Sequence, residues 1–274
     1  MKKNKIIAGL LALTLVAGVF SGCGKKEEKK DENTVRIGLT GTIYEDIWNP
    51  IAEELKDEGI NIELVQFSDF SLPNQALDSG DIDLNAFQHH AYFNSDTSSN
   101  GYKITPIGDT FVIAMNVYSD KIKDVSELKD GDKVAVPNDA SNEGRALKVL
   151  ESAGIIKIKE SAGNNPDITD IEEYNVKIEL VEANAADLCA LLPDVKAAVI
   201  NGNYALDYGI DPNEDAIFKE TEYADDSYFC LIAARTDEAD NEVYKKIVDA
   251  FQSESTKKIF QDEFKGFFVP AWEQ

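Results

Sequence analysis

Hydrophobic and polar residues alternate along this chain in two patterns from residue 34 onward. Short runs rich in β-branched residues, such as TVRIGLT (34–40) and INIELVQF (60–67), are typical of strands. Between these runs lies the longer stretch YEDIWNPIAEELKDEG (44–59), in which apolar residues recur every three or four positions, as on one face of a helix. Regular alternation of strands and helices predicts an α/β fold with a largely parallel sheet.

The alternation breaks once and then resumes. The runs 103–111 and 112–119 are both strand-like with no long helix between them, which predicts a crossing out of a first α/β unit. After them the pattern predicts a second series of elements, with strands at 133–139, 176–182 and 195–202 and helices at 141–154 and 183–193. A buried strand at 228–235 and helices at 240–252 and 254–262 then end the chain.

This organisation predicts two lobes. We expect lobe I to contain residues 34–114 and 232–274, and lobe II residues 115–231. The two crossings, near 110–118 and 225–235, would act as hinges. Clefts between such units are where small ligands usually bind, so we expect a ligand cleft between the lobes.

The first 22 residues have the features of an export signal. MKKNK is basic, and the fifteen uncharged residues that follow are fewer than the roughly 20 that a membrane-spanning helix needs. The run ends in FSGC, which resembles the lipobox of bacterial lipoproteins and implies that Cys23 is lipidated. The alternative is an incidental cysteine in a cleaved signal. Residues 24–33 are polar or charged apart from one glycine, as expected of a tether to a lipid anchor.

Net charge narrows the choice of partners. The chain has 27 basic and 51 acidic residues, and its first 22 residues hold three lysines and no acid. The body that follows is therefore strongly acidic. A field of this sign repels phosphate backbones and anionic headgroups, so we expect neither a nucleic-acid partner nor direct adsorption to a bilayer.

The common local signatures of enzymes are absent from the sequence. It contains no GxSxG, GxxxxGK[ST], HExxH, CxxC or glycine-rich dinucleotide turn, so we expect neither a cofactor nor an enzyme. His89 and His90 are the only histidines, and adjacent residues project to different sides of an element, so we expect no metal site there. Cys189 and Cys230 are either two buried thiols or a disulfide, and the sequence alone leaves both possibilities open.

Three stretches hold more polar and aromatic groups than packing requires. VPNDASNEGRAL (136–147) predicts a helix beginning near Ser141, with Arg145 one turn in, where it would bind a carboxylate or pair with one of the many acids. NAFQHHAYF (85–93) offers aromatic side chains for a pocket or for the core. INGNYAL (200–206) places Asn201 and Asn203 at a strand-to-helix turn, as helix caps or as ligand contacts.

Five ordered blocks of sequence, read together, point to a family. They are FSDFSLPNQAL (67–77), SGDIDLNAFQHHAYF (79–93), VAVPNDASNEGRALKVLESAGIIKI (134–158), AVINGNYAL (198–206) and VPAW (269–272). With the lipobox, they resemble the NlpA/MetQ family, the substrate-binding lipoproteins of methionine ABC importers. The resemblance implies a periplasmic-binding-protein-like fold of type II, whose lobes close over a free amino acid. It also implies a location on the extracytoplasmic face of the cell membrane and delivery of the ligand to a permease and its ATPase.

The resemblance also implies roles for individual residues. Arg145 would hold the ligand's carboxylate with Asn142 beside it, and Asn201 or Asn203 would contact its ammonium or carboxylate. The ligand's side chain would lie in a pocket formed by Phe70, Phe87, His89 and Tyr92. These roles suit a zwitterion with a thioether side chain, because a cation meets the carboxylate and aromatic rings meet the polarizable sulfur.

Two residues depart from the family pattern. Phe70 stands where the family usually has tyrosine, and Cys230 replaces an asparagine that contacts the polar end of the ligand. A thiol is a weak hydrogen-bond partner, so one contact of roughly 0.5–1.5 kcal/mol is missing. We therefore expect L-methionine as the ligand, with another amino acid, D-methionine or a methionine-containing dipeptide as alternatives. An enzyme or an adhesin on the same scaffold is a remote alternative.

Overall fold

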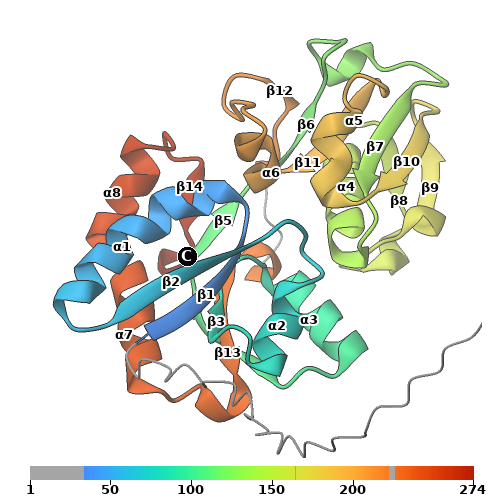
Figure 1. Ribbon diagram of the computed structural model, residues 1–274. Helices are drawn as coiled ribbons and strands as arrows, with labels where there is room; N and C mark the ends of the chain where they lie inside the picture. Colours follow the sequence, from blue (N-terminus) through green and yellow to red (C-terminus); the bar gives the residue numbers. More distant parts are fainter. Residues whose placement is uncertain (1–33, 164, 222–225) are drawn as a thin grey trace, which may run out of the picture. The chain divides into compact units, whose positions relative to one another are not determined.

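The computed structural model describes residues 34–163, 165–221 and 226–274. The predicted export signal, Cys23 and the tether at 24–33 lie outside the described residues. The described part of the chain forms two five-stranded sheets and two short two-stranded ones (Figure 1). We call each five-stranded sheet, together with the helices that pack on it, a lobe.

The first lobe is built on a sheet with the strand order β2-β1-β3-β13-β4. Its strands are β1 (Thr34–Thr40), β2 (Asn61–Phe67), β3 (Leu84–Asn85), β4 (Ile104–Asp109) and β13 (Leu231–Arg235). Its helices are α1 (Glu45–Asp57), α2 (Pro73–Ser79), α3 (His90–Asn100), α7 (Glu242–Phe251) and α8 (Glu254–Asp262). Strand β1 runs parallel to β2 and β3, whereas β13 runs antiparallel to β3 and β4.

Strand β13 shows why its apolar run lies at the centre of this sheet. Leu231 and Ala233 pack in one buried cluster, and Ile232 and Ala234 pack in another on the opposite face. Because side chains alternate between the faces of a strand, a continuous apolar run is expected where both faces are covered. The predicted buried strand at 228–235 is thereby confirmed, with its regular part beginning at Leu231.

The second lobe is built on a sheet with the strand order β10-β7-β11-β6-β12. Its strands are β6 (Met115–Tyr118), β7 (Lys133–Pro137), β10 (Glu179–Ala183), β11 (Ala197–Asn201) and β12 (Ala216–Phe218). Its helices are α4 (Ala140–Ser152), α5 (Leu188–Leu191) and α6 (Gly202–Asp207). Strand β7 pairs in parallel with β10 and β11, and β6 pairs antiparallel with β11 and β12. Strand β7 is also covered on both faces, with Val134 and Val136 in one cluster and Ala135 in another.

The chain leaves the first lobe through β5 (Phe111–Ile113), which lies between β4 and β6 in the sequence. This strand pairs antiparallel with β14 (Phe268–Pro270) and with neither five-stranded sheet. The chain returns between β12 and β13, through a stretch that is described only in part. A second small sheet pairs β8 (Ile156–Ile158) with β9 (Ile171–Tyr174). The two-lobed α/β fold predicted from the sequence is confirmed.

Short 3-10 helices occur at several ends and turns of these elements. They are η1 (Thr42–Tyr44), η2 (Val125–Glu127), η3 (Glu160–Ala162), η4 (Ile168–Asp170), η5 (Ala185–Asp187), η6 (Asp226–Tyr228), η7 (Thr236–Glu238) and η8 (Ala271–Glu273). The helix predicted over 183–193 is therefore shorter than expected, since η5 and α5 share this segment. Asn184 caps η5 by accepting a hydrogen bond from the Ala186 N–H.

The prediction of a largely parallel sheet is wrong in part. Within the described residues, each five-stranded sheet has two parallel and two antiparallel pairs of neighbours. The strands that run against the others are β6 and β13, which come directly after the two crossings. Each enters its sheet without a crossover helix, and such a helix is what keeps consecutive strands parallel.

The structure answers the question about the two later cysteines. Cys189 lies in α5 and Cys230 lies just before β13, and both are buried free thiols. Burial raises the pKa of each thiol to about 12, so both remain protonated at neutral pH.

None of the helices in the described residues has the length and apolar character needed to cross a membrane.

Gly202 provides a test of how closely α6 approaches the crossing strand. A Cβ atom at this position would lie 2.6 Å from Ile113 Cγ1 and 2.8 Å from the Ala114 carbonyl oxygen. Because a backbone atom cannot move aside cheaply, we expect Gly202→Ala to lower the free energy of unfolding by roughly 1–3 kcal/mol. Urea unfolding would measure this change, and an unchanged midpoint would contradict the close approach.

Candidate functional site

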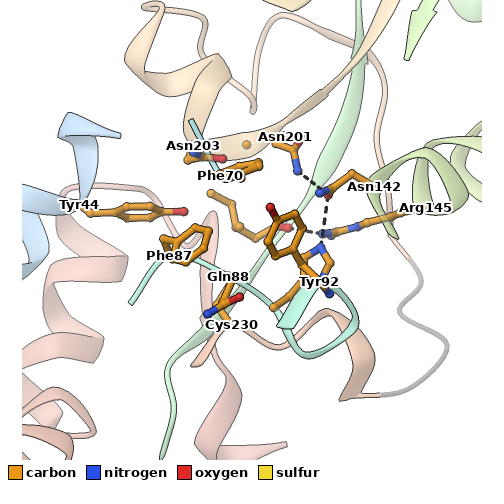
Figure 2. A pocket seen from close by; sticks show the side chains of 13 residues that line it. Tyr44, Phe70, Phe87, Gln88, Tyr92, Asn142, Arg145, Asn201, Asn203 and Cys230 are labelled. Atoms are coloured by element: carbon orange, nitrogen blue, oxygen red, sulfur yellow. Dashed lines mark hydrogen bonds between the residues drawn. The ribbon is translucent and has the colours of Figure 1, made fainter. Parts of the chain in front are cut away.

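A pocket with about 370 Å³ of empty space lies between the two lobes (Figure 2). The pocket is lined by Tyr44, Phe70, Phe87, Gln88, His89, Tyr92, Ile113, Asn142, Arg145, Asn201, Gly202, Asn203 and Cys230. The structure thus brings together all nine residues that the sequence analysis singled out as ligand contacts. That each of them contacts a ligand stays a prediction.

The start of α4 places two of these residues on the pocket. Strand β7 ends at Pro137, and Asp139 caps the helix by accepting a hydrogen bond of 3.0 Å from the Asn142 N–H. Asn142 and Arg145 are three residues apart, so they lie on the same face of the helix. The predicted helix start near Ser141 is confirmed, and Asp139 is the residue that caps it.

Hydrogen bonds between side chains determine the orientation of the groups at the polar end of the pocket. His89 Nδ1 accepts from the Tyr92 N–H at 3.1 Å, so the ring proton is on Nε2, which donates to Asn142 Oδ1 at 3.2 Å. Asn142 Nδ2 donates to both carboxylate oxygens of Asp139, at 3.0 Å each. Asn201 Nδ2 donates to the same Asn142 Oδ1 at 2.8 Å.

This arrangement leaves one acceptor without a partner. Because Asn201 uses its amide nitrogen on Asn142, its oxygen must point elsewhere, and in the described part of the chain Asn201 Oδ1 is buried with no hydrogen-bond partner. Buried polar atoms are rarely left in this state. Asn201 Oδ1 is therefore a candidate contact for a ligand that brings its own hydrogen-bond donor.

The second candidate asparagine is already engaged. Asn203 Nδ2 donates to the Thr40 carbonyl oxygen at 3.1 Å, which links α6 of the second lobe to the end of β1 in the first. Of the two asparagines left open by the sequence, the hydrogen bonds favour Asn201 as the ligand contact and Asn203 as a link between the lobes.

Arg145 forms a buried ion pair that the sequence did not reveal. Its Nε and Nη2 atoms donate to the two carboxylate oxygens of Glu220 at 2.8 and 2.6 Å, and the two side chains are only 3% and 7% exposed. Nη2 also donates to the Ile113 carbonyl at 2.8 Å, and the guanidinium carbon lies 4.4 Å from the centroid of the Tyr228 ring. Pairing with an acid, one of the two alternatives for Arg145, is thus observed.

Glu220 was missed because its partner is remote in sequence. The two residues are 75 positions apart, and Glu220 lies in a polar, acidic stretch (211–227) with no motif of its own. Its carboxylate also accepts the Met115 N–H at 2.7 Å, so it links the start of β6 to α4. Only its position after a short apolar run (AIF, 216–218) was a signal in the sequence.

Aromatic rings form the apolar end of the pocket. The ring centroids of Phe70, Phe87 and Tyr92 lie 5.9 to 6.0 Å from one another, and Tyr204 packs on Phe70 at 4.8 Å. Figure 2 shows Arg145 and the Asn142 and Asn201 amides on one side of the view, and Tyr44 and Phe87 on the other. The pocket therefore has a polar end and an aromatic end.

Gln88 lines the pocket, but its side-chain amide donates to residues outside the pocket. Its Nε2 donates to Asn74 Oδ1 at 2.6 Å and to Asn85 Oδ1 at 2.9 Å, and its Oε1 accepts from Asn74 Nδ2 at 2.8 Å. Since all three side chains are buried, this network holds the segment that carries Phe87 and His89.

Among the described residues, no group of three or more His, Cys, Asp or Glu is placed to hold a metal ion.

The electrostatic state of the pocket is close to neutral. Burial, and then the positive charge of Arg145, lower the pKa of His89 to about 3, so the imidazole is uncharged at neutral pH. Burial keeps the Cys230 thiol protonated. Arg145 is the one lining residue with a full charge at neutral pH, and Glu220 balances it.

Two α/β lobes with a pocket between them have the architecture of the two-lobed, periplasmic-binding-protein-like class. Within this class, the model of the NlpA lipoprotein family matches residues 35–272. The chain therefore belongs to the NlpA lipoprotein family, as its resemblance suggested.

Relatives with names and structures support this assignment. The D-methionine-binding lipoprotein MetQ of Escherichia coli is 40% identical over 254 residues, which cover 92% of each chain. A nutrient-binding protein from Burkholderia cenocepacia, solved bound to methionine, is 41% identical with a TM-score of 0.82, over 86% of this chain and 99% of that one. A methionine-binding protein, MetQ, is 39% identical with a TM-score of 0.83, over 87% and 98% of the two chains.

The Arg145–Glu220 pair predicts how the fold responds to loss of the cation. Arg145→Ala leaves a buried carboxylate without its partner, so we expect the free energy of unfolding to fall by about 3–5 kcal/mol. In the double variant Arg145→Ala, Glu220→Gln the buried charge is gone, and most of this loss should be recovered. Denaturant unfolding of the three proteins tests this, and equal stability of the single and double variants would contradict it.

His89 predicts a pH dependence of stability. In the unfolded chain a histidine titrates near pH 6.5, whereas in the folded chain His89 titrates at about 3, so between these values the unfolded state binds one more proton. This contribution to stability is fully present above pH 6.5 and is lost as the pH falls toward 3. Between pH 7 and pH 5 the free energy of unfolding of the wild-type protein should fall by about 2 kcal/mol more than that of the His89→Gln variant. The slope behind this figure is about 1.4 kcal/mol per pH unit below pH 6.5. Urea unfolding at several pH values measures this difference. An equal pH dependence of stability in the two proteins would contradict a neutral His89.

Proposed function

We propose that this protein is the substrate-binding lipoprotein of an ABC importer, and that it captures free L-methionine for delivery to the permease and ATPase subunits. One observation carries the proposal. A single buried pocket combines the Arg145 cation, the unpartnered acceptor Asn201 Oδ1 and a wall of aromatic rings.

A free α-amino acid fits the polar end of this pocket. Its carboxylate would contact Arg145, with Asn142 beside it, in addition to the pair with Glu220. Its ammonium would donate to Asn201 Oδ1, which satisfies the buried acceptor. Such a ligand would contact α4 and the end of β11 in the second lobe, while its side chain would reach the first lobe.

The balance of charge favours a ligand with an uncharged side chain. Arg145 and Glu220 together are neutral, and a zwitterion adds one charge of each sign. A lysine or glutamate side chain would bring a third charge, and no other lining residue has a full charge to meet it. Burial of an unpaired charge is costly, so charged amino acids are disfavoured.

The aromatic end suits a thioether. The rings of Phe70, Phe87 and Tyr92 surround a space in which a flexible, polarizable side chain makes favourable sulfur–aromatic contacts. Burial of a methionine side chain contributes about 1.5–3 kcal/mol, and each charge-assisted hydrogen bond about 1.5–3 kcal/mol. Micromolar binding corresponds to about 8 kcal/mol, which lies below the ceiling of roughly 13 kcal/mol for a ligand of about nine heavy atoms.

Relatives support the same ligand class. The Escherichia coli relative is named for binding D-methionine, and the Burkholderia cenocepacia structure contains methionine. D-methionine is therefore the first alternative, followed by another apolar amino acid or a methionine-containing dipeptide. The family also favours a binding protein over an enzyme, and we expect no turnover of the ligand.

Membrane attachment completes the proposal. Cleavage before Cys23 and acylation of this residue would anchor the protein on the extracytoplasmic face of the cell membrane, with residues 24–33 as a tether. The ligand would enter between separated lobes, and its contacts to both lobes would favour closure about the two crossings. The closed, loaded form would then be presented to the permease.

Thermal-shift measurements with a panel of ligands test the proposal. L-methionine should raise the melting temperature, because a ligand that binds only the folded state stabilises it. Lysine and glutamate should leave it unchanged, because their third charge has no partner in the pocket. D-methionine, leucine and a methionine-containing dipeptide complete the panel.

The panel tests the identity of the ligand and the binding role of the protein separately. A shift with D-methionine, leucine or the dipeptide but none with L-methionine would overturn the ligand and keep the binding role. A shift with lysine or glutamate as large as that with methionine would contradict the neutral pocket. The folded double variant Arg145→Ala, Glu220→Gln serves as the matched control and should show no shift with any amino acid.

A further inference from the structure

The carboxylate of Asp207 links the two lobes at a point outside the pocket. It accepts three hydrogen bonds, from the Thr42 N–H at 3.1 Å, the Thr42 hydroxyl at 2.9 Å and the Ile43 N–H at 2.8 Å. Asp207 is the last residue of α6 in the second lobe, whereas Thr42 and Ile43 are the first residues of η1 in the first lobe. Asp207 is not among the residues that line the pocket between the lobes.

The three bonds make Asp207 the cap of a helix in the other lobe. η1 runs without a break into α1, and its own N-cap residue, Gly41, has no side chain with which to satisfy the first backbone N–H groups. A carboxylate at this position is favourable both as a hydrogen-bond acceptor and as a negative charge at the positive end of a helix. The cap that the first lobe lacks is supplied by the second.

Gly41 makes room for this contact. Its φ of +114° is a conformation that other residues rarely adopt, and a Cβ atom here would lie 2.6 Å from Asp207 Oδ2. The segment therefore combines a missing cap, a backbone that only glycine adopts readily and an acid from the other lobe. Asp207 can cap η1 only when the two lobes lie as they do in this structure.

The same helix connects this contact to the ligand pocket. α6 begins with Gly202 and Asn203, which line the pocket, and Asn203 donates to the Thr40 carbonyl of the first lobe. α6 is thus attached to the segment 40–43 at both of its ends. The residue after this segment, Tyr44, lines the pocket as well.

We propose that Asp207 is a positioning residue for ligand binding, which acts by holding the lobes in the arrangement that encloses the ligand. The inference rests on the proposed function, since it assigns to Asp207 control over how long the captured amino acid stays bound. When the lobes separate, Asp207 loses all three donors and the start of η1 is exposed to water. The contact therefore stabilises the closed form over the open one without touching the ligand.

Dissociation kinetics of L-methionine test the proposal, with Asp207→Asn in the full chain. An amide of the same size cannot accept all three hydrogen bonds and carries no charge. We expect the ligand to dissociate about tenfold faster, equivalent to about 1.4 kcal/mol, with an almost unchanged association rate. The effect is limited because Asn203–Thr40 and the Asn184–Asp69 hydrogen bond still connect the lobes.

Two further variants separate this role from a general loss of charge or of contacts. Asp211→Asn makes the same change four residues away, where Asp211 pairs with Lys265 of the first lobe at 3.2 Å in an exposed ion pair of small energy. It should leave dissociation nearly unchanged. Thr42→Val removes one of the three hydrogen bonds to Asp207 and should give an increase smaller than that of Asp207→Asn.

The outcomes decide between the proposal and its failure. Dissociation from Asp207→Asn at the wild-type rate, or an equal acceleration by Asp211→Asn, would overturn the role of Asp207. If the wild-type protein binds no methionine, the proposed ligand is wrong, and small-angle scattering then decides on Asp207 alone. In that case a larger radius of gyration for Asp207→Asn than for wild type supports the proposal, and equal radii overturn it.

Discussion

The oriented amide of Asn142 is the interaction on which the rest of the pocket depends. Its nitrogen is held by both oxygens of Asp139, so its oxygen must face His89 and Asn201. That orientation matches the proton on His89 Nε2 and directs the amide nitrogen of Asn201 to Asn142. The consequence is one buried acceptor, Asn201 Oδ1, whose position is set before any ligand arrives. Preorganisation of this kind reduces the cost of binding.

The buried Arg145–Glu220 pair supplies the second constraint. Glu220 holds the start of β6 through the Met115 N–H, and Arg145 holds the end of the crossing strand β5 through the Ile113 carbonyl. Because the pair is neutral, it favours a zwitterion with an uncharged side chain. In a chain with 51 acidic residues, Glu220 is set apart because it is buried beside the arginine.

The sequence predicted the features that depend on local pattern. Helix caps and buried strands are encoded in short stretches, so the fold class followed from them. The nine predicted lining residues followed from the family resemblance, whereas Tyr44, Gln88, Ile113 and Gly202 were not predicted. The directions of β6 and β13 did not, because they depend on how the crossings enter each sheet. These antiparallel pairings join segments far apart in the chain.

Contacts between residues far apart in the sequence could not be predicted from it either. Glu220 meets Arg145 from 75 residues away, and Asp207 meets Thr42 from 165 residues away. Neither acid stands in a motif, and each is one of many in an acidic chain. Only the folded arrangement distinguishes a carboxylate that caps a helix of the other lobe from one that is merely solvated.

A crystal structure of the protein with L-methionine tests the central claim most directly. We expect the ligand's ammonium nitrogen to lie within hydrogen-bond distance, about 3 Å, of Asn201 Oδ1. We also expect the carboxylate to lie at Arg145 and Asn142 to keep its hydrogen bonds to Asp139. An ammonium group placed elsewhere, or an Asn201 amide that has turned away from Asn142, would contradict this claim.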